Sequence, residues 1–433
     1  MLSQDRTSFG RRRSVLRVTA IAPPRAGTPR AAFSHRAFRW VFLGAFASNI
    51  GTWMQNVALL AFANRLGGAE YVGIVTFAQL GPMLVLSPFG GVLADAVDRK
   101  LVMVAAASVQ LSMSIGLAVV ATADRPSKLL IVVLVLVMGV AAAANAPASQ
   151  ATMPALVGRA DLSGAVALNS AQMNAARVLG PVLAVIPFLE STSTVFLVNA
   201  ATYLFVIAAV SLVDFDGSPN RGVHHSPMRE LVGGLKAAKD DPVIGRALAT
   251  VGIYSLFSLV FIYQMTGFAE DVLGLDESSF RLLFGAFGLG AAIGAIAVGT
   301  RLSAIDRTVL VRAGLGGFAV ALGLFAVQTS AAWAYPLVGL TGFFYFIVIT
   351  ALSTAIQHEV TDEARGRVMG LWMMAWAGLV PVGSLLAGYV IEDWGYRNVL
   401  LVGAAVALAL IALADLSGAT AEPPDPAPQS DLL

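Results

Sequence analysis

Arg177 is the residue of this sequence whose type and position carry the clearest chemical meaning. It lies in an apolar run that begins near Ala165, and a helical rise of 1.5 Å per residue places it about 18 Å along that run. An ionisable group at such depth in an apolar segment needs water or a partner. With Asn174 one turn earlier, Arg177 could supply the counter-charge for an anionic or catecholate-like group. The alternative is a structural arginine that bonds backbone carbonyls or amide side chains of neighbouring segments.

Two stripes of polar and aromatic residues suggest the facing walls of a cavity. In the first apolar segment, positions i, i+4 and i+7 of one helical face are Asn49, Trp53 and Asn56. At an offset of 208 residues these correspond to a second stripe, in the seventh segment, which is expected to share one face as well: Phe257, Phe261 and Gln264. The alternative role for such residues is packing between helices, where amide and small side chains commonly form hydrogen bonds in membranes.

Four further residues are candidates for the same cavity. Gln55 and Tyr263 flank the two stripes. Trp372 and Trp376 lie four residues apart on one helical face of the eleventh segment, where they could stack against a planar solute.

Residue patterns typical of enzymes and metal centres are absent from the sequence. It contains no cysteine, and its four histidines fall in expected tails, loops or a helix end. It contains no HExxH motif, and no Ser/His/Asp or cysteine-based constellation supports a membrane-embedded enzyme. We therefore expect no catalytic residue, no cofactor and no metal.

The composition indicates an integral membrane protein. Hydrophobic residues make up 57% of the 433 residues and charged residues 12%, with a mean hydropathy of +0.76, whereas soluble chains carry about 25% charged residues. Because backbone groups in lipid must be satisfied within the segment, the spans are expected to be helices. Apolar runs predict twelve of them: 38–64, 71–93, 101–122, 128–150, 165–189, 194–213, 244–269, 280–300, 307–328, 333–356, 367–391 and 397–416.

The distribution of positive charge predicts the orientation. With both termini in the cytoplasm, 22 Lys and Arg residues fall inside, five fall outside and Arg177 lies within a span. By the positive-inside rule this favours a multi-pass protein of the inner (cytoplasmic) membrane.

The same charges mark the domain boundaries. Residues 1–37 are predicted to be a basic, disordered cytoplasmic tail that faces anionic lipid, and no nucleic-acid partner is expected. Six spans (38–214) precede a cytoplasmic linker (215–243) with a short amphipathic helix near 227–239. Six more spans (244–416) precede an acidic, Pro-rich tail (417–433).

Two weak internal matches relate the halves. The dipeptide Asp98-Arg99 falls on Asp306-Arg307 at an offset of 208, and Pro181 falls on Pro381 at an offset of 200. Two six-helix halves related by an axis along the membrane normal would hold a solute between them, near mid-bilayer.

The loop GGVLADAVDRKLVMV (Gly90–Val104) resembles the signature of the major facilitator superfamily. The resemblance implies that Asp95 faces the N-terminus of span eleven when the cytoplasmic side is closed, and that the positive end of that helix dipole favours the carboxylate. Gly91 would allow close helix approach, and Arg99 with Lys100 would hold the loop at the headgroups. A purely topological loop is the alternative, and Ala96 stands where many members carry a basic residue.

Three longer segments resemble the superfamily branch of enterobactin-exporter-like efflux proteins, the transmembrane secretion effectors. They are FASNIGTWMQNVALLAF in span one, the stretch from Asn145 to Ala184, and VTDEARGRVMGLWM entering span eleven. The resemblance covers about residues 38–416.

This resemblance implies a secondary active transporter, not an enzyme, that exports a small amphipathic molecule such as a siderophore or an antibiotic. It implies alternating access, proton coupling and function as a monomer in the lipid bilayer. None of the 26 acids lies near the middle of a span, so the proton relay is open, with His358–Glu359 and Glu270–Asp271 as candidates. An uptake carrier for a small metabolite and a non-transporting sensor or scaffold remain alternatives.

Overall fold

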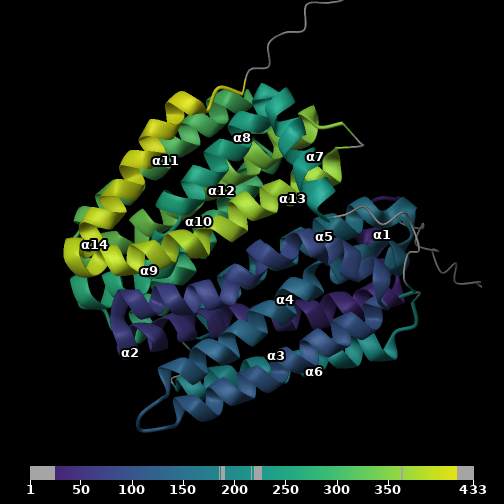
Figure 1. Cartoon of the computed structure of the whole chain (residues 1–433), viewed down its shortest axis with the longest axis horizontal. Helices are drawn as coiled ribbons and strands as arrows, with labels where there is room; N and C mark the ends of the chain where they lie inside the picture. The colour runs from purple at the N-terminus through teal and green to yellow at the C-terminus, as the bar shows by residue number, and fades with distance from the viewer. Residues whose placement is uncertain are drawn as a thin grey trace, which may run out of the picture.

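The computed structural model describes residues 25–184, 186, 191–215, 217–218, 227–361 and 364–416, without the side chains of residues 87–96, 227 and 230. Within these residues all regular structure is helical and no strand occurs. The helices form two bundles, an N-terminal half (29–212) and a C-terminal half (242–413), which Figure 1 shows in purple to teal and in green to yellow. The predicted all-α class is confirmed.

The N-terminal half contains six α-helices. Their bounds are α1 (Pro29–Ser34), α2 (Arg36–Ala96), α3 (Arg99–Ala121), α4 (Lys128–Val157), α5 (Leu162–Leu183) and α6 (Thr192–Leu212). A single 3-10 turn, η1 (Arg159–Asp161), connects α4 to α5.

The C-terminal half follows the linker helix α7 (Pro227–Asp240). Its first rod is a continuous series of α8 (Pro242–Ile253), the π-turn η3 (Tyr254–Ser258), α9 (Phe261–Gly267) and the π-turn η4 (Phe268–Val272). The remaining elements are α10 (Glu277–Gly299), α11 (Arg307–Val327), α12 (Ala331–Glu359), α13 (Arg365–Met373), the π-turn η5 (Met374–Gly378) and α14 (Leu379–Leu413).

Two of the long helices turn back on themselves at glycines. α2 is broken at Gly67 and Gly68, and α14 at Gly395; the φ angles of 63° at Gly68 and 76° at Gly395 favour a residue without Cβ. The described residues hold nine helical stretches long and apolar enough to cross a membrane, and each of the two kinked stretches contains two predicted spans. Predicted span five corresponds to α5, which is not among the nine, so the count of twelve stays a prediction at that helix.

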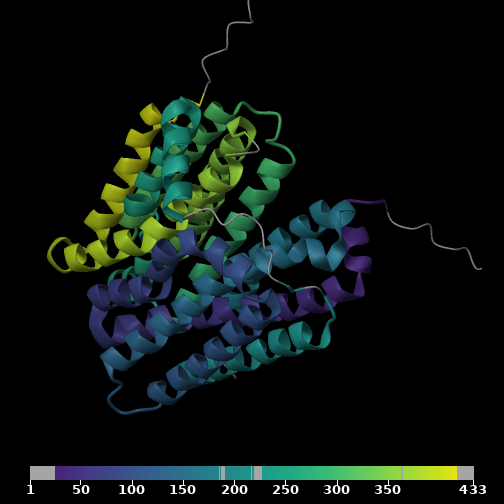
Figure 2. The same cartoon turned by 45° about the vertical axis from the view of Figure 1, so that its right-hand side comes forward.

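The two halves meet at one end of the molecule. We call this the kink end, because Gly67, Gly68 and Gly395 lie there, and the opposite end, with α1 and α7, the linker end. In both Figure 1 and Figure 2 the two bundles are packed together at the kink end, and Figure 2 shows them diverging toward the linker end.

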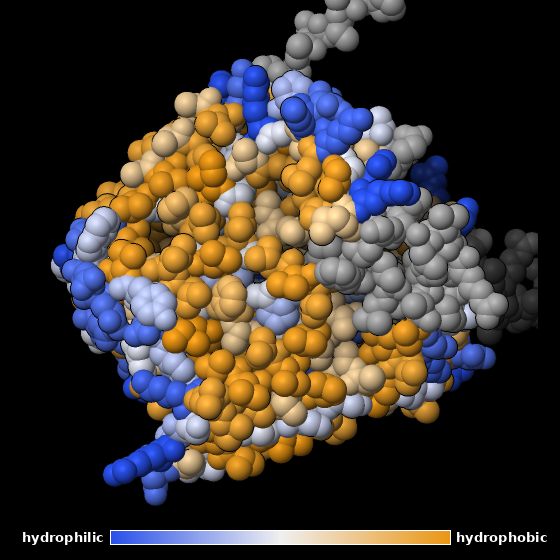
Figure 3. All heavy atoms as spheres, viewed as in Figure 1, coloured by the Kyte–Doolittle hydropathy of each residue, from blue (hydrophilic) through white to orange (hydrophobic). Residues whose placement is uncertain are grey.

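Apolar side chains cover most of the surface between these ends. In Figure 3 hydrophobic residues dominate the visible face and hydrophilic ones gather at its margins. Large apolar side chains are exposed on most helices, for example Leu129 at 74%, Ile296 at 66% and Leu212 at 86%. Such a surface is stable only against lipid.

Small residues allow the halves to approach closely at the kink end. A Cβ at Gly73 of α2 would lie 2.7 Å from the carbonyl oxygen of Ser384, and one at Gly388 of α14 would lie 2.6 Å from that of Ala69. Larger side chains would separate α2 from α14. Glycine-mediated backbone contact is the usual way in which helices associate within a bilayer.

The aspartates of the internal repeat occupy equivalent structural positions. Asp98 caps α3 by accepting from the backbone N–H of Lys100 and Leu101, and Asp306 caps α11 by accepting from that of Val309. A short side chain with an acceptor oxygen satisfies the free N–H groups of a helix N-terminus.

The structure differs from the predicted tail in residues 25–37. Instead of being disordered, these residues form α1 and the start of α2, and Ala31 and Ala32 of α1 are buried. Asp161 accepts hydrogen bonds from His35 (2.8 Å) and from the backbone N–H of Gly27 (2.9 Å). The hydrogen bond from His35 lowers the pKa of Asp161, and that from Gly27 lowers it further. The apolar contacts of α1 were missed because its helix is short and lies among arginines.

The linker contains the amphipathic helix that was predicted near 227–239. α7 packs against α13, where Gly233 and Gly234 lie against Arg367. Several predicted segments lie partly or wholly outside the described residues: 1–24 of the basic tail, 185 and 187–189 of span five, 216 and 219–226 of the linker, and the whole acidic tail 417–433.

Candidate substrate-binding site

Arg177 lies where the two halves meet and is held by aromatic rings. Its guanidinium carbon is 5.2 Å from the ring centroid of Trp53 on α2 and 4.9 Å from that of Phe346 on α12. Its Nε and Nη1 atoms are buried and have no hydrogen-bond partner among the described residues. A guanidinium between two rings gains cation–π attraction, but its N–H groups keep their hydrogen-bonding capacity.

Three more aromatic residues of the C-terminal half are linked to this site, two of them near the guanidinium and the third through one of these two. Tyr345 of α12 accepts a hydrogen bond of 3.2 Å from the indole N–H of Trp376 in η5. Tyr263 of α9 and Tyr345 both lie within electrostatic range of Arg177. We call this set the arginine–aromatic cluster: Trp53, Arg177, Tyr263, Tyr345, Phe346 and Trp376.

The stripe on span one is partly reproduced. Asn49, Trp53 and Asn56 are all half-buried, and Asn56 accepts a hydrogen bond of 2.7 Å from Gln79 of the same helix hairpin. Gln55 instead belongs to the interior of the N-terminal half, where it is only 1% exposed. Its side-chain oxygen accepts from Ser114 at 2.8 Å and from Asn199 at 2.9 Å, which is the packing role weighed as the alternative.

The stripe predicted on span seven does not share one face. The π-turn η3 lies at the start of this stripe, and its i→i+5 bonding changes the direction of the side chains that follow. Phe257 is 46% exposed on the outer surface, whereas Phe261 is 1% exposed and contacts Phe287 and Phe318 in the core. Neither residue lies in the arginine–aromatic cluster.

The side chain of Gln264 links the two halves by hydrogen bonds to backbone carbonyl groups. It is 1% exposed and donates hydrogen bonds of 3.2 Å to the carbonyl oxygens of Ala69 in α2 and Ser384 in α14. This residue therefore contacts the other half, but through packing at the kink end.

The π-turn η5 changes the direction of the side chains in span eleven. Trp372 precedes η5 and is 3% exposed, whereas Trp376 lies within it and is half-buried beside Tyr345. Asn174, one turn before Arg177, donates to the carbonyl oxygen of Ser170 at 3.0 Å.

The basic pair of the signature loop is bound to the segment that follows α6. Arg99 donates from its backbone to Gly217 at 2.9 Å, and Lys100 donates to the carbonyl oxygen of Val213 at 2.9 Å. Arg307, the counterpart of Arg99, is half-buried at the start of α11. The side chain of Asp95 and the side-chain surroundings of Gly91 are not described, so the proposed contact of Asp95 with span eleven stays a prediction.

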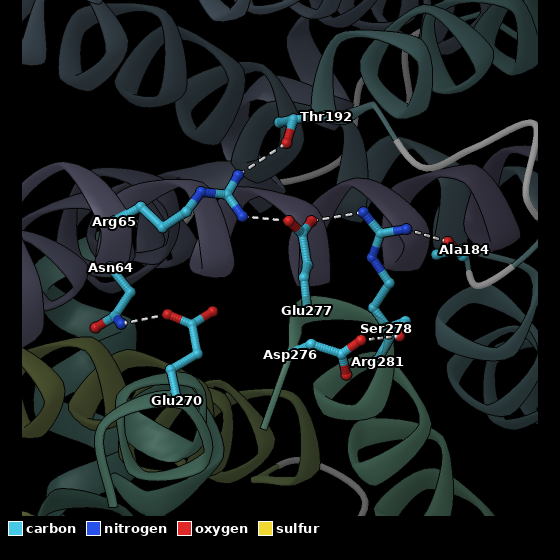
Figure 4. A network of polar contacts seen from close by, with 9 residues as sticks. All are labelled: Asn64, Arg65, Ala184, Thr192, Glu270, Asp276, Glu277, Ser278 and Arg281. Atoms are coloured by element: carbon cyan, nitrogen blue, oxygen red, sulfur yellow. Dashed lines mark hydrogen bonds and ion pairs between the residues drawn. The ribbon is translucent and has the colours of Figure 1, made fainter. Parts of the chain in front are cut away.

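A polar network at the kink end connects the halves, and sequence reasoning did not find it (Figure 4). Glu277 at the start of α10 forms ion pairs with Arg65 of α2 and with Arg281 one turn along its own helix. Arg281, 3% exposed, also donates to the carbonyl oxygen of Ala184 at the end of α5.

Two further hydrogen bonds extend this kink-end network. Asn64 donates to Glu270 of η4 at 2.7 Å and accepts from the hydroxyl of Tyr396 at 3.4 Å. Beside them Asp276 caps α10, and hydrogen bonds from Ser279 and Ser278 lower the pKa of its carboxyl group. The sequence alone shows only that acidic and basic residues fall at the outer ends of the spans. It does not indicate which of these residues form ion pairs.

Within the described residues no group of three or more His, Cys, Asp or Glu side chains could hold a metal ion. The arrangement offers instead a guanidinium with two buried N–H groups that lack partners among the described residues, aromatic faces around it, and a network that joins two bundles. These are means of binding and of conformational change.

Comparisons with known proteins concern the family and the fold of this chain. The enterobactin exporter EntS of Shigella boydii serotype 18 is 28% identical over 363 residues, which cover 82% of this chain and 85% of that protein. Among solved structures, the nucleoside transporter NupG has a TM-score of 0.71 at 13% identity, covering 87% of this chain and 99% of NupG. The human organic anion transporter MFSD10 (TETRAN) has a TM-score of 0.59 at 17% identity, covering 89% and 99%. The two structures show the fold alone.

The family match covers almost the whole chain. The sequence profile of the family described as transmembrane secretion effector matches residues 27–424. This confirms the resemblance stated from the sequence. The chain belongs to the transmembrane secretion effector family, a branch of the membrane transporters of the major facilitator superfamily.

Proposed function

We propose that this transporter exports a small amphipathic molecule with an anionic or catechol-like group and an aromatic or apolar body. It works by alternating access between the two halves and is driven by protons. The arginine–aromatic cluster is the site at which it binds the molecule.

The observation that carries the proposal is the state of Arg177. Its charge is partly stabilised by the rings of Trp53 and Phe346, but its buried Nε and Nη1 groups find no hydrogen-bond partner in the part of the chain that the structure describes. Buried donors left in this way cost free energy, which a ligand oxygen would recover through charge-assisted hydrogen bonds. Since no carboxylate among the described residues pairs with Arg177, an anionic ligand would not have to displace an ion pair within that part of the chain.

The composition of the cluster supports an amphipathic ligand. Trp53 belongs to the N-terminal half, and Tyr263, Tyr345 and Trp376 to the C-terminal half. Flat rings from both halves suit a planar or apolar body, and a ligand between them would contact both halves as their relative position changes.

The export direction is supported by the relatives and by charge. The relatives named enterobactin exporters suggest siderophore-like cargo, and the predicted orientation places the linker end in the cytoplasm. In that orientation the kink end is external and closed. A cargo would then enter from the cytoplasm, and export would require the kink-end network to open.

Proton coupling is proposed to act through this network. Glu277 and Glu270 are its acids, and each joins the halves through Arg65 or Asn64. A proton on either carboxylate would remove a negative charge from the contact and so favour opening of the kink end.

The test is the binding of ligands of different charge to variants of Arg177. Arg177→Gln keeps hydrogen-bonding groups but removes the charge, and Arg177→Lys keeps the charge but loses the planar fork. We expect Gln to weaken the binding of anionic ligands about tenfold or more, the cost of a charge-assisted hydrogen bond, with Lys intermediate. Neutral ligands of the same shape should lose much less.

Protein abundance and unfolding temperature serve as controls. A purely structural arginine would give equal losses for anionic and neutral ligands, together with lower abundance of both variants. If binding of anionic and of neutral ligands weakened equally, Arg177 would have no role in substrate recognition, whatever the protein abundance.

A further inference from the structure

A groove on the lipid-facing surface lies between α2 and α6 at the linker end. Its volume is about 820 Å³. Its floor consists of small residues, namely Gly44, Ala47, Ala208 and Ala209. At Gly44 the two helices touch, since a Cβ there would lie 3.0 Å from that of Ala209. Above this contact the side chains of both helices are too short to fill the space between them, and the groove results.

Large apolar side chains form the two rims. Trp40 is 54% exposed, Phe205 is 59% exposed and Leu212 is 86% exposed. Their exposure places the groove on the outside of the bundle, where its surroundings are lipid. Trp40 beside the mouth is the residue type that concentrates at the membrane interface.

The length of the groove matches one leaflet. Its lining residues on α2 run from Arg36 to Ala47, which at 1.5 Å per residue is about 16 Å. The hydrocarbon core of a bilayer is about 30 Å thick, so one leaflet contributes about half of that. An acyl chain of a single lipid would therefore extend along the groove with its headgroup at the mouth.

The mouth carries one charge of each sign. Arg36 and Asp214 both line it, both are exposed, and no hydrogen bond or ion pair joins either to another described residue. The nearby Lys100 is already occupied, because it donates to Val213 and lies over the ring of Phe215 at 5.7 Å. A second lipid-facing groove, of about 330 Å³, lies at the kink end. Its described lining residues include one charged side chain, the acid Asp393, and no basic one.

We propose that the α2–α6 groove is a binding site for a phospholipid whose headgroup carries both a phosphate and a primary ammonium, that is, a phosphatidylethanolamine. Arg36 binds the phosphate, for which a guanidinium is well suited. Asp214 accepts from the ammonium, which has three N–H donors. A choline headgroup has the same two charges but no N–H donor, and a glycerol headgroup has no cation.

The experiment uses the full chain, purified, stripped of lipid in detergent and titrated with single lipids under native mass spectrometry. The lipids are phosphatidylethanolamine, phosphatidylcholine and phosphatidylglycerol with identical acyl chains. We expect phosphatidylethanolamine to bind best. Arg36→Gln and Asp214→Asn should each weaken it about tenfold, as expected for the loss of one charge-assisted hydrogen bond.

Two further variants make the test specific. Arg39→Gln removes the same charge from the same helix at an exposed position that does not line the groove, and it should leave binding unchanged. Ala208→Leu fills the floor and should weaken all three lipids alike, because it removes space for the acyl chain.

Several outcomes would overturn the site. Equal binding of the three lipids, or equal losses in Arg36→Gln and Arg39→Gln, would indicate adventitious lipid only. If the variants reduced export while lipid binding stayed the same, the groove would serve the cargo and not a lipid. Lipid binding and the response of Arg177 variants are measured separately, so this proposal and the proposed function can fail independently.

Discussion

At the scale of single residues, the neighbours of a polar side chain decide its role. Gln55 and Asn56 are adjacent in sequence, yet Gln55 is enclosed by Ser114 and Asn199 whereas Asn56 is half-buried beside Gln79. Arg177 shows the same effect, because rings hold it where amides or carbonyls had been the expected structural partners. The difference between an amide that packs helices and one that is available to a ligand lies in what surrounds it.

Asp161 gives a prediction about pH at this scale. Its folded-state pKa lies below the ordinary 3.8, with the hydrogen bond from His35 as the largest cause. Its stabilising contacts with His35 and Gly27 are thus fully present above that ordinary value and are lost as the pH falls through the lowered pKa. We expect the protection of α1 amides against hydrogen exchange, taken relative to the intrinsic rate at each pH, to fall over that acidic range.

Two aspartate variants check this expectation. Asp161→Asn should show faster exchange in α1 already at neutral pH and no further carboxylate-linked change on acidification. Asp98→Asn, which alters the cap of α3, should leave α1 unaffected. An unchanged exchange rate in Asp161→Asn would show that the apolar contacts of Ala31 and Ala32 suffice to hold α1.

At the scale of elements, π-turns decide which face of a span a residue occupies. η3 lies within the rod that forms span seven and η5 within span eleven, so residues four apart around them do not share a face as they would in a regular helix. Phe257 and Phe261, and likewise Trp372 and Trp376, differ in exposure for this reason. A uniform period of 3.6 cannot reveal such an irregularity.

Phenylalanine replacements in span seven test this effect. Phe261→Ala should lower the free energy of unfolding by about 3 kcal/mol or more, the usual cost of deleting a buried ring, since Phe261 contacts Phe287 and Phe318. Phe257→Ala, the matched control on the outer surface, should cost far less. Thermal unfolding of both proteins in the same detergent makes the comparison, and similar losses would mean that both rings lie in the core.

At the scale of the whole molecule, closure of the kink end depends on residues from both halves. Glu277 is shared between Arg65 of the N-terminal half and Arg281 of its own helix. If the halves separate, the pair of Glu277 with Arg65 has to break, together with the hydrogen bonds from Arg281 to Ala184 and from Asn64 to Glu270. The i,i+4 pair with Arg281 still keeps the Glu277 carboxylate from being left alone. This arrangement lowers the cost of opening, because an unpaired buried charge is the expensive state.

The absence of cysteine from the sequence allows a direct test of this closure. Ser384→Cys places a thiol of similar size in α14, at a position 0% exposed and opposite Gly73. We expect an impermeant maleimide added outside cells to label it slowly, and several times faster when Glu277→Gln is also present. The neutral amide weakens the ion pair that holds Arg65.

Two controls separate opening from general loosening. Ser258→Cys, 1% exposed and bonded within the C-terminal half to Gly403, should remain unlabelled in both backgrounds. Glu392→Gln removes an exposed acid from α14 and should not accelerate labelling of Ser384→Cys. Equal labelling with and without Glu277→Gln would show that glycine packing alone closes this end.

The sequence by itself determined the properties that depend on local composition. The shortage of charge required a membrane protein, the apolar runs required helices, and the polar linker between two sets of spans contained the helix found at α7. The quoted motifs were enough to indicate the family, because each consists of residues close together in the chain.

Only the tertiary structure decided the contacts that depend on register and on distant segments. Arg65 and Glu277 are 212 positions apart, and no local pattern pairs these two charges among the others at span ends. The π-turn η3 moved Phe257 to the surface. The packing of α5 against α2 and α10, with α12 against α10, brought Arg177 between Trp53 and Phe346. A helix period fixes the faces of one segment, but which faces meet depends on how all the helices pack together.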